Sequence, residues 1–157
     1  MKALLRSTLL LPLLAAVALP ACSSDDITLG TGSRASLAIT VDPNPVVATQ
    51  NSIGSCSATY KLTITETNGL GGEFVFVNAS TYDPKTGSLI ALNYYDTSDM
   101  QVFVGTKRIE AAGSVSFTQT ASYSTSDLSK AATLVVSVQV KDDKGNLVQA
   151  STLVNIE

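Results

Sequence analysis

The sequence predicts an all-β protein, an antiparallel β-sandwich of seven to eight strands, and three observations carry this prediction. Short segments alternate apolar and polar residues, turn-forming residues recur roughly every 8 to 12 positions, and no convincing helical period is present. Of the 157 residues, 45% are hydrophobic and 15% are charged, a balance that suits one globular domain. We therefore expect a single sandwich over residues 36–157.

The first half of this domain contains three predicted strands. Residues 37–41 alternate in apolar character, and the strand ends at residues 42–45, where two prolines cannot donate hydrogen bonds to a sheet, as is typical of a kinked edge strand. Residues 58–65 alternate in the same way, and Cys56 shares their apolar parity, which predicts a buried thiol. Residues 74–77 are apolar on both faces, which is typical of a strand inside a sheet.

The middle of the domain is expected to contain two shorter strands. Residues 83–87 (Asp-Pro-Lys-Thr-Gly) have the composition of a turn. Residues 89–95 and 101–104 are predicted strands, separated by a polar loop at residues 96–99.

The C-terminal part contains three further predicted strands. Residues 114–123 alternate apolar side chains with hydroxyls. Residues 134–140 and 148–156 alternate as well, and residues 142–146 (Asp-Asp-Lys-Gly-Asn) supply a hairpin turn between them. Together these segments indicate a sandwich or barrel, of which we favour the sandwich.

Residues 128–146 resemble the E–F corner, strand F and F–G turn of immunoglobulin-like and fibronectin type III-like domains. At the level of pattern the resemblance covers about 120 residues. It implies an immunoglobulin-like sandwich whose first strand starts at the same end as the loops at residues 69–72 and 142–146. The turn at residues 83–87 is then expected at the opposite end.

The N-terminus has the pattern of an export signal. Lys2 and Arg6 precede eleven residues, Leu9 to Leu19, without a polar side chain. This run is about half the ~20 residues that a membrane-spanning helix needs. A cleaved signal peptide over residues 1–21 is therefore expected.

Residues 19–22 (Leu-Pro-Ala-Cys) resemble the lipobox of bacterial lipoproteins. The resemblance implies cleavage before Cys22, lipid attachment to its thiol, and anchoring in the bacterial cell envelope; Ser23 at the next position resembles the pattern of outer-membrane lipoproteins. The alternative is an ordinary signal peptide cleaved after small residues. The Ser, Asp, Gly and Thr content of residues 22–35 predicts a flexible tether.

Composition also excludes several functions. The chain has no histidine, which removes the commonest metal ligand and proton shuttle, so we expect no enzyme, no metal and no cofactor. A net charge of -3 argues against a nucleic-acid partner. Cys56 has no histidine to activate it, so a catalytic role is disfavoured, and an intermolecular disulfide is the alternative to a buried free thiol.

The candidate binding residues lie around the predicted 83–87 turn. Tyr82, Tyr94 and Tyr95 have rings that could stack on a sugar or peptide, and Asp83 and Lys85 lie beside Tyr82. Because adjacent residues of a strand point to opposite faces, one of the neighbouring tyrosines is expected in the core. End-on binding would use residues 82–87, whereas an exposed edge strand is the alternative.

Aspartates recur in the predicted loops, where they either form turns or bind calcium, and we favour turns. These aspartates are Asp42, Asp83, Asp96, Asp99, Asp142 and Asp143. The function expected from the sequence is a lipid-anchored, non-catalytic binding or structural module of the envelope with a protein partner. The alternative is a carbohydrate-binding accessory lipoprotein.

Overall fold

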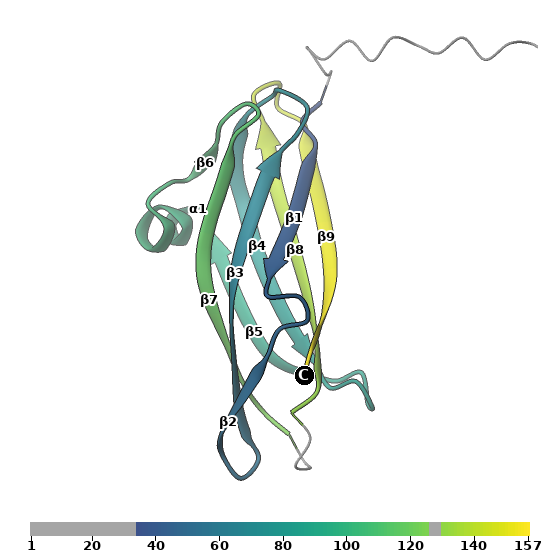
Figure 1. Ribbon diagram of the computed structural model, residues 1–157. Helices are drawn as coiled ribbons and strands as arrows, with labels where there is room; N and C mark the ends of the chain where they lie inside the picture. Colours follow the sequence, from purple (N-terminus) through teal and green to yellow (C-terminus); the bar gives the residue numbers. More distant parts are fainter. Residues whose placement is uncertain (1–33, 126–129) are drawn as a thin grey trace, which may run out of the picture.

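The computed structural model describes residues 34–125 and 130–157, and this part of the chain forms two packed antiparallel sheets (Figure 1). The first sheet contains β1 (Leu37–Asp42), β2 (Ala48–Ser52), β3 (Ser55–Glu66) and β7 (Ser114–Ser124). The second contains β4 (Gly72–Tyr82), β5 (Leu89–Asp96), β6 (Arg108–Ile109), β8 (Ala132–Asp142) and β9 (Leu147–Ile156). The predicted all-β antiparallel sandwich is confirmed, with nine strands in the described residues; β2 and β6 are short strands that the alternation pattern did not indicate.

Strands that are distant in sequence pair within each sheet. β3 pairs with β1 and β2 along one edge and with β7 along the other. The second sheet has the order β5-β4-β8-β9, with β6 beside the start of β4. The pairings of β3 with β7 and of β4 with β8 are Greek-key connections. The predicted edge position of residues 37–41 and the predicted inner position of residues 74–77 are confirmed.

The segment between β1 and β2 leaves the first sheet briefly and pairs with the edge of the second. Pro43 and Pro45 cannot continue the ladder of β1, and Val46 then lies beside the last strand. Its N–H donates to the Asn155 carbonyl at 2.9 Å, and its carbonyl accepts from the Glu157 N–H at 2.9 Å. This segment therefore closes one open side of the sandwich with parallel pairing to β9.

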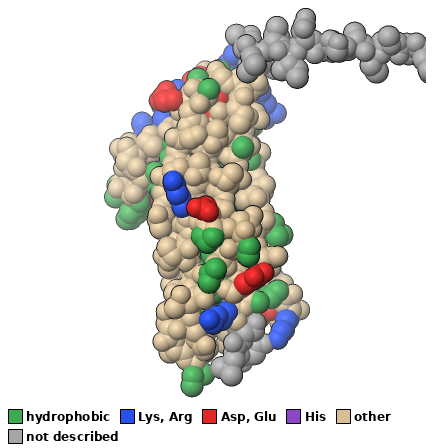
Figure 2. Space-filling model, in the orientation of Figure 1, with side chains coloured by type: hydrophobic (Ala, Val, Ile, Leu, Met, Phe, Trp, Pro, Cys, Tyr) green, Lys and Arg blue, Asp and Glu red, His purple; other side chains and the backbone are tan. Residues whose placement is uncertain are grey.

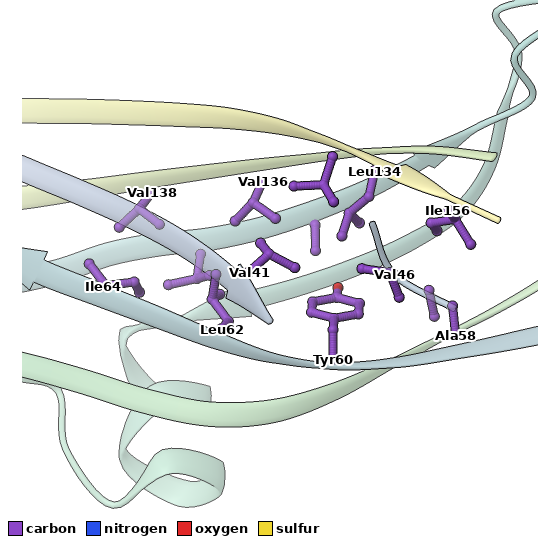
Figure 3. Packing of buried hydrophobic residues seen from close by; sticks show 14 of the residues in the cluster. Val41, Val46, Ala58, Tyr60, Leu62, Ile64, Leu134, Val136, Val138 and Ile156 are labelled. Carbon is purple, nitrogen blue, oxygen red and sulfur yellow. The ribbon is translucent and has the colours of Figure 1, made fainter. Parts of the chain in front are cut away.

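The core lies between the sheets and consists of the side chains that point inward from each strand (Figure 3). Burial of each large side chain there stabilises the fold by about 1.5–3 kcal/mol. Cys56 follows this parity and is 2% exposed, so the predicted buried free thiol is confirmed within the described residues. The largest inward side chains include Tyr60, Leu62, Ile64, Phe74, Leu134, Val136 and Val138.

A β-bulge in β4 changes which side chains reach the surface. The register with β8 shifts between Phe74 and Phe76. As a result Phe74 and Val77 both point inward and are fully buried, whereas Phe76 points outward and stacks on Tyr94. The bulge therefore places an aromatic ring on the outer surface of the second sheet.

The predictions of a strand at residues 101–104 and of a loop at residues 96–99 are wrong. The segment instead forms a short helix α1 (Thr97–Asp99) that continues into a π-helical turn η1 (Met100–Val104), projecting beside the sandwich in Figure 1. No helix in the described part of the chain is long and apolar enough to span a membrane.

This segment is helical because two aspartates cap its first turn. In the sequence the same polar residues have the composition of a loop. The Asp96 carboxylate accepts from the Asp99 N–H at 2.9 Å, and the Asp99 carboxylate accepts from the Asp96 N–H at 3.2 Å, forming a capping box. Met100 and Val104 are four residues apart and both pack against the core. Gly105 ends the turn with φ of 86°, a left-handed conformation that favours glycine.

Candidate binding face

The outer surfaces of the two sheets carry different chemistry. The first sheet presents mostly hydroxyl side chains from β3 and β7, together with Lys61 and Asp42, on the side drawn in Figure 2. Across this surface three hydroxyl pairs hydrogen-bond at 2.8–2.9 Å, namely Thr59–Thr120, Thr63–Ser116 and Thr65–Ser114. The hydroxyls predicted to face solvent in residues 114–123 are thus confirmed.

The outer surface of the second sheet has a broad region without carboxylate, ammonium or guanidinium groups, which we call the uncharged face. Charged residues border it: Glu73 and Lys141 pair across β4 and β8 at one end, and Asp96 at the corner caps α1. The strand registers define its members as Phe76, Asn78, Ser80 and Tyr82 of β4, Leu89, Leu92 and Tyr94 of β5, Thr133, Val135, Ser137 and Gln139 of β8, and Gln149, Ser151, Leu153 and Asn155 of β9.

Large apolar side chains are exposed on this face. Leu89, Leu92, Tyr94 and Leu153 have exposed fractions of 51%, 53%, 54% and 63%. Single exposed leucines are common on protein surfaces, whereas several on one uncharged sheet surface are unusual, so this face is the candidate site.

One row across the four strands of this face, here called the aliphatic row, has aliphatic residues on β5, β8 and β9 and a serine on β4. Leu92 is in register with Ser80, Ser80 with Val135, and Val135 with Leu153. Ser80 is only 7% exposed. The row therefore presents apolar side chains on β5, β8 and β9, with a small, nearly buried serine between the first two.

The next row along the strands is bulky on one side and short on the other. Tyr94 stacks on Phe76 with ring centroids 6.1 Å apart and an angle of 24° between the rings. Across the sheet, the Ser137 and Ser151 hydroxyls hydrogen-bond at 2.8 Å. In the row Tyr94, Asn78, Ser137 and Ser151, the β5 position therefore stands higher than the β8 and β9 positions.

The structure separates the three tyrosines chosen from the sequence. Tyr82 and Tyr94 lie on the uncharged face, whereas Tyr95 points to the opposite face of β5. Tyr95 packs edge-on against Phe103 and Phe117, with centroid distances of 6.1 and 6.0 Å. The prediction that one of the adjacent tyrosines belongs to the core is confirmed.

Asp83 and Lys85 lie in the turn between β4 and β5. The Asp83 carboxylate accepts the N–H groups of Lys85 and Thr86 at 2.7 and 3.1 Å, so it stabilises the turn. Lys85 is exposed there. Cys22, the predicted lipid-attachment residue, lies outside the described residues. Within residues 34–125 and 130–157, no three His, Cys, Asp or Glu residues gather as metal ligands would.

At the end of the sandwich where residue 34 lies, here called the entry end, a buried carboxylate joins three segments. Glu66 is 1% exposed. Burial opposes its ionisation, but the backbone N–H donors outweigh burial and hold the pKa of this carboxyl below its usual value. The donors lie 2.8–3.1 Å from the carboxylate oxygens and belong to Ser36, Asn68, Gly69, Leu70 and Ala112.

Asp142 has a similar role in the β8–β9 turn. Its carboxylate accepts the Ala35 N–H at 3.2 Å, the Lys144 N–H at 3.0 Å and the Asn146 N–H at 2.8 Å. Burial opposes its ionisation, yet the hydrogen bonds from Asn146, Ala35 and Lys144 lower its pKa. Because residue 35 contacts this turn, the predicted position of residues 142–146 beside the start of the first strand is confirmed.

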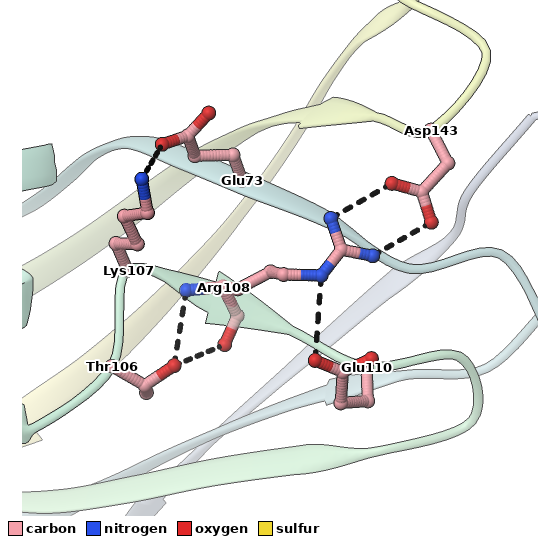
Figure 4. Close-up of polar contacts among 6 residues, drawn as sticks. All are labelled: Glu73, Thr106, Lys107, Arg108, Glu110 and Asp143. Atoms are coloured by element: carbon pink, nitrogen blue, oxygen red, sulfur yellow. Dashed lines mark hydrogen bonds and ion pairs between the residues drawn. The ribbon is translucent and has the colours of Figure 1, made fainter.

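A network of exposed ion pairs links β6 to its neighbours (Figure 4). The Arg108 guanidinium donates two hydrogen bonds to the Asp143 carboxylate at 2.8 and 2.9 Å, and its Nε lies 3.3 Å from Glu110. The Lys107 ammonium lies 3.4 Å from Glu73. Such exposed pairs contribute little to stability, and those of Arg108 with Asp143 link β6 to the β8–β9 turn.

Sequence reasoning missed the aliphatic row. Leu153 occupies the polar parity of its strand, with Gln149, Ser151 and Asn155, which is a detectable signal of an exposed apolar residue, whereas Leu92 shares its parity with Tyr94 and gives no such signal. That they belong to one row depends on the order β5-β4-β8-β9, which alternation does not determine.

Comparison with known proteins shows a similar fold. Neither a protein-family model nor a curated protein matches the chain. Northeast Structural Genomics Consortium target SoR45 is similar with a TM-score of 0.58 and 11% identity, over 76% of this chain and 84% of that one. A Bordetella pertussis protein described as ApaA is similar with a TM-score of 0.51 and 12% identity, over 76% of this chain and 93% of that one. At these identities the similarity concerns the fold alone.

Proposed function

We propose that this chain is a lipid-anchored, non-catalytic module of the bacterial cell envelope, expected in the outer membrane, that binds a protein through the uncharged face of an immunoglobulin-like sandwich. The lipobox resemblance at residues 19–22 supports the anchor. The strand order, β1 and β7 beside β3 against β5-β4-β8-β9, supports the immunoglobulin-like assignment. The chain has no histidine and Cys56 is buried, which supports a role without catalysis.

The observation that carries the protein-binding proposal is the aliphatic row from Leu92 through Val135 to Leu153. Aliphatic side chains gain free energy by leaving water against another apolar surface, about 25 cal/mol per Å² buried. Sugars bind mainly through hydroxyl hydrogen bonds and stacking on aromatic rings. A row of leucine and valine therefore favours a protein over a glycan.

A carbohydrate-binding function is the second candidate, because one side of the face has suitable chemistry. Tyr94 is 54% exposed, and its ring stacks on that of Phe76 from the neighbouring strand. Asn78, Gln139 and Gln149 present amides on the same surface, which can donate to and accept from sugar hydroxyls. This reading requires Tyr94 and does not require Leu153.

Chemical cross-linking of the tagged full-length chain in native envelopes tests these proposals. We expect Leu153→Asp to reduce capture of the protein partner at least tenfold, since burial of a carboxylate in an apolar contact is unfavourable. Thr118→Asp on the hydroxyl surface is the matched control and should capture normally. If both variants capture the same proteins as the parent, binding through the uncharged face is refuted. Retention on a neutral polysaccharide that is lost in Tyr94→Ala but kept in Leu153→Asp would favour the glycan instead.

A further inference from the structure

We infer that the partner on the uncharged face is a second copy of this chain, so that two sandwiches pack face to face about a two-fold axis parallel to the strands. This inference rests on the proposed protein-binding function. It follows from the absence of charge on this face, from the unequal heights of its side chains, and from the end of the sandwich at which the chain enters the domain.

The absence of charge suits self-association. In a two-fold contact the same surface is presented from both sides, so a cluster of one charge would meet itself across the axis. The whole chain is acidic, with a net charge of -3. The uncharged face brings two copies together without opposing carboxylates, whereas its border residues Glu73 and Lys141 remain outside the contact.

The unequal heights of the side chains on this face select the direction of the two-fold axis. Rotation about an axis parallel to the strands exchanges the β5 edge with the β9 edge and leaves each row at its own level. Tyr94 of one copy then lies over Ser151 of the other, which places a bulky side chain over a short one. Leu92 lies over Leu153 in the same way, so the aliphatic rows cover each other. An axis across the strands would instead lay β5 over β5 and β9 over β9, so that the strand with the bulky side chains faces itself and the strand with Ser151 faces itself.

The direction of the chain selects the same axis. Residues 34 and 35 lie at the entry end beside the β8–β9 turn, and residues 1–33 precede them (Figure 1). With the axis parallel to the strands, both copies have their entry ends on the same side. Two chains anchored through Cys22 in one membrane can therefore form this contact, whereas the alternative axis would direct their entry ends apart.

The size of the face suits a dimer that forms weakly in solution. Four strands about 4.8 Å apart and four rows about 6.8 Å apart cover roughly 500 Å² of each copy. Two copies then bury about 1,000 Å², close to the lower limit for specific interfaces. Attachment of both copies to one membrane raises their effective concentration and favours the contact.

A photoreactive benzophenone amino acid at Ser151 of the full-length chain, in native envelopes, tests this inference. Co-expression of copies carrying tags of two lengths should give adducts of three sizes, each the sum of two chains. The same probe at Thr118, on the hydroxyl surface, is the control and should give none of them.

Charge variants with the Ser151 probe test the geometry. Leu92→Lys and Leu153→Asp should each reduce the two-chain adduct at least tenfold, and the double variant should restore it, since each lysine then faces the partner's Asp substitution. If the double variant does not restore the adduct, the proposed direction of the axis is wrong. If Ser151 forms specific adducts with a different protein, the partner is not a second copy, but the proposed function is supported. If Ser151 forms no adduct, both the second copy and the proposed function are refuted.

Discussion

One buried side chain, Glu66, connects the start of β1, the loop after β3 and the loop before β7. Its two carboxylate oxygens accept five backbone N–H groups from these segments. Glu66 is 1% exposed, so its carboxylate would be buried without partners if these N–H groups did not donate to it. The geometry of the entry end therefore depends on an ionised residue rather than on apolar packing alone.

Glu66→Gln should destabilise the fold by about 2–3 kcal/mol, because an amide NH₂ cannot accept the N–H groups that one carboxylate oxygen now accepts. Urea unfolding at neutral pH measures this change. Glu73→Gln is the matched control: Glu73 is an exposed glutamate whose side chain is 49% accessible, and its substitution should change the free energy of unfolding by less than about 0.5 kcal/mol. Equal effects of the two substitutions would show that Glu66 does not stabilise the entry end.

The same residue predicts a dependence of stability on pH. The pKa of Glu66 is lower in the folded protein than its ordinary value of about 4.3. Its ionisation therefore stabilises the fold above the ordinary value, and this stabilisation is lost as the pH falls through the lowered pKa. The stability difference between the parent and Glu66→Gln should shrink on acidification in urea titrations. A difference that grows as the pH falls would contradict this.

At the scale of elements, the helical turn between β5 and β6 depends on its cap. Asp96→Ala removes the capping box and should cost about 1 kcal/mol locally. We expect hydrogen exchange to accelerate at residues 97–104 while exchange in β4 and β8 is unchanged. Ser98→Ala, an exposed position in the same turn, is the control. Unchanged protection of the turn in Asp96→Ala would mean that Met100 and the contact of the Thr97 hydroxyl with the Phe74 carbonyl, at 2.6 Å, suffice to hold it.

Elements were predictable from sequence where one face of a strand is buried. The alternation in residues 58–65 and 134–140 reflects inward side chains that the core fully covers, so a period of two is enforced by burial. The strand prediction for residues 101–104 was wrong because Val102 and Val104 also fit an alternating pattern. In the structure Val104 packs on the core while Val102 is 74% exposed on the outside of the helical turn.

The uncharged face was only partly predictable for a topological reason. Tyr82 and Tyr94 belong to strands that are adjacent in sequence, so a shared surface could be anticipated. Leu92 and Leu153 are brought into one row by the pairing of β4 with β8 and of β8 with β9. Such non-local pairing is determined by the packing of the whole sandwich rather than by either strand alone.

At the scale of the whole molecule, the proposed anchor and the proposed dimer are coupled. A contact of about 1,000 Å² gives modest affinity, so its occupancy depends strongly on the local concentration of copies. The proposed lipid attachment would confine the copies to one surface and present their entry ends in a common direction. Loss of the lipid should therefore weaken the dimer without altering either sandwich.

Cys22→Ala tests this coupling, because it removes the proposed acylation site and leaves residues 34–157 unchanged. We expect the variant to leave the membrane fraction, to lack acyl mass, and to give at least tenfold less two-chain adduct from the Ser151 probe at equal expression. Its thermal unfolding should match that of the parent domain, and Ser23→Ala should behave as the parent in every assay. If the soluble variant is concentrated, the adduct should return, since the contact surface itself is intact. A Cys22→Ala chain that keeps acyl mass and its place in the membrane would refute the anchor, whereas one that leaves the membrane with an undiminished adduct would show that the dimer does not need it.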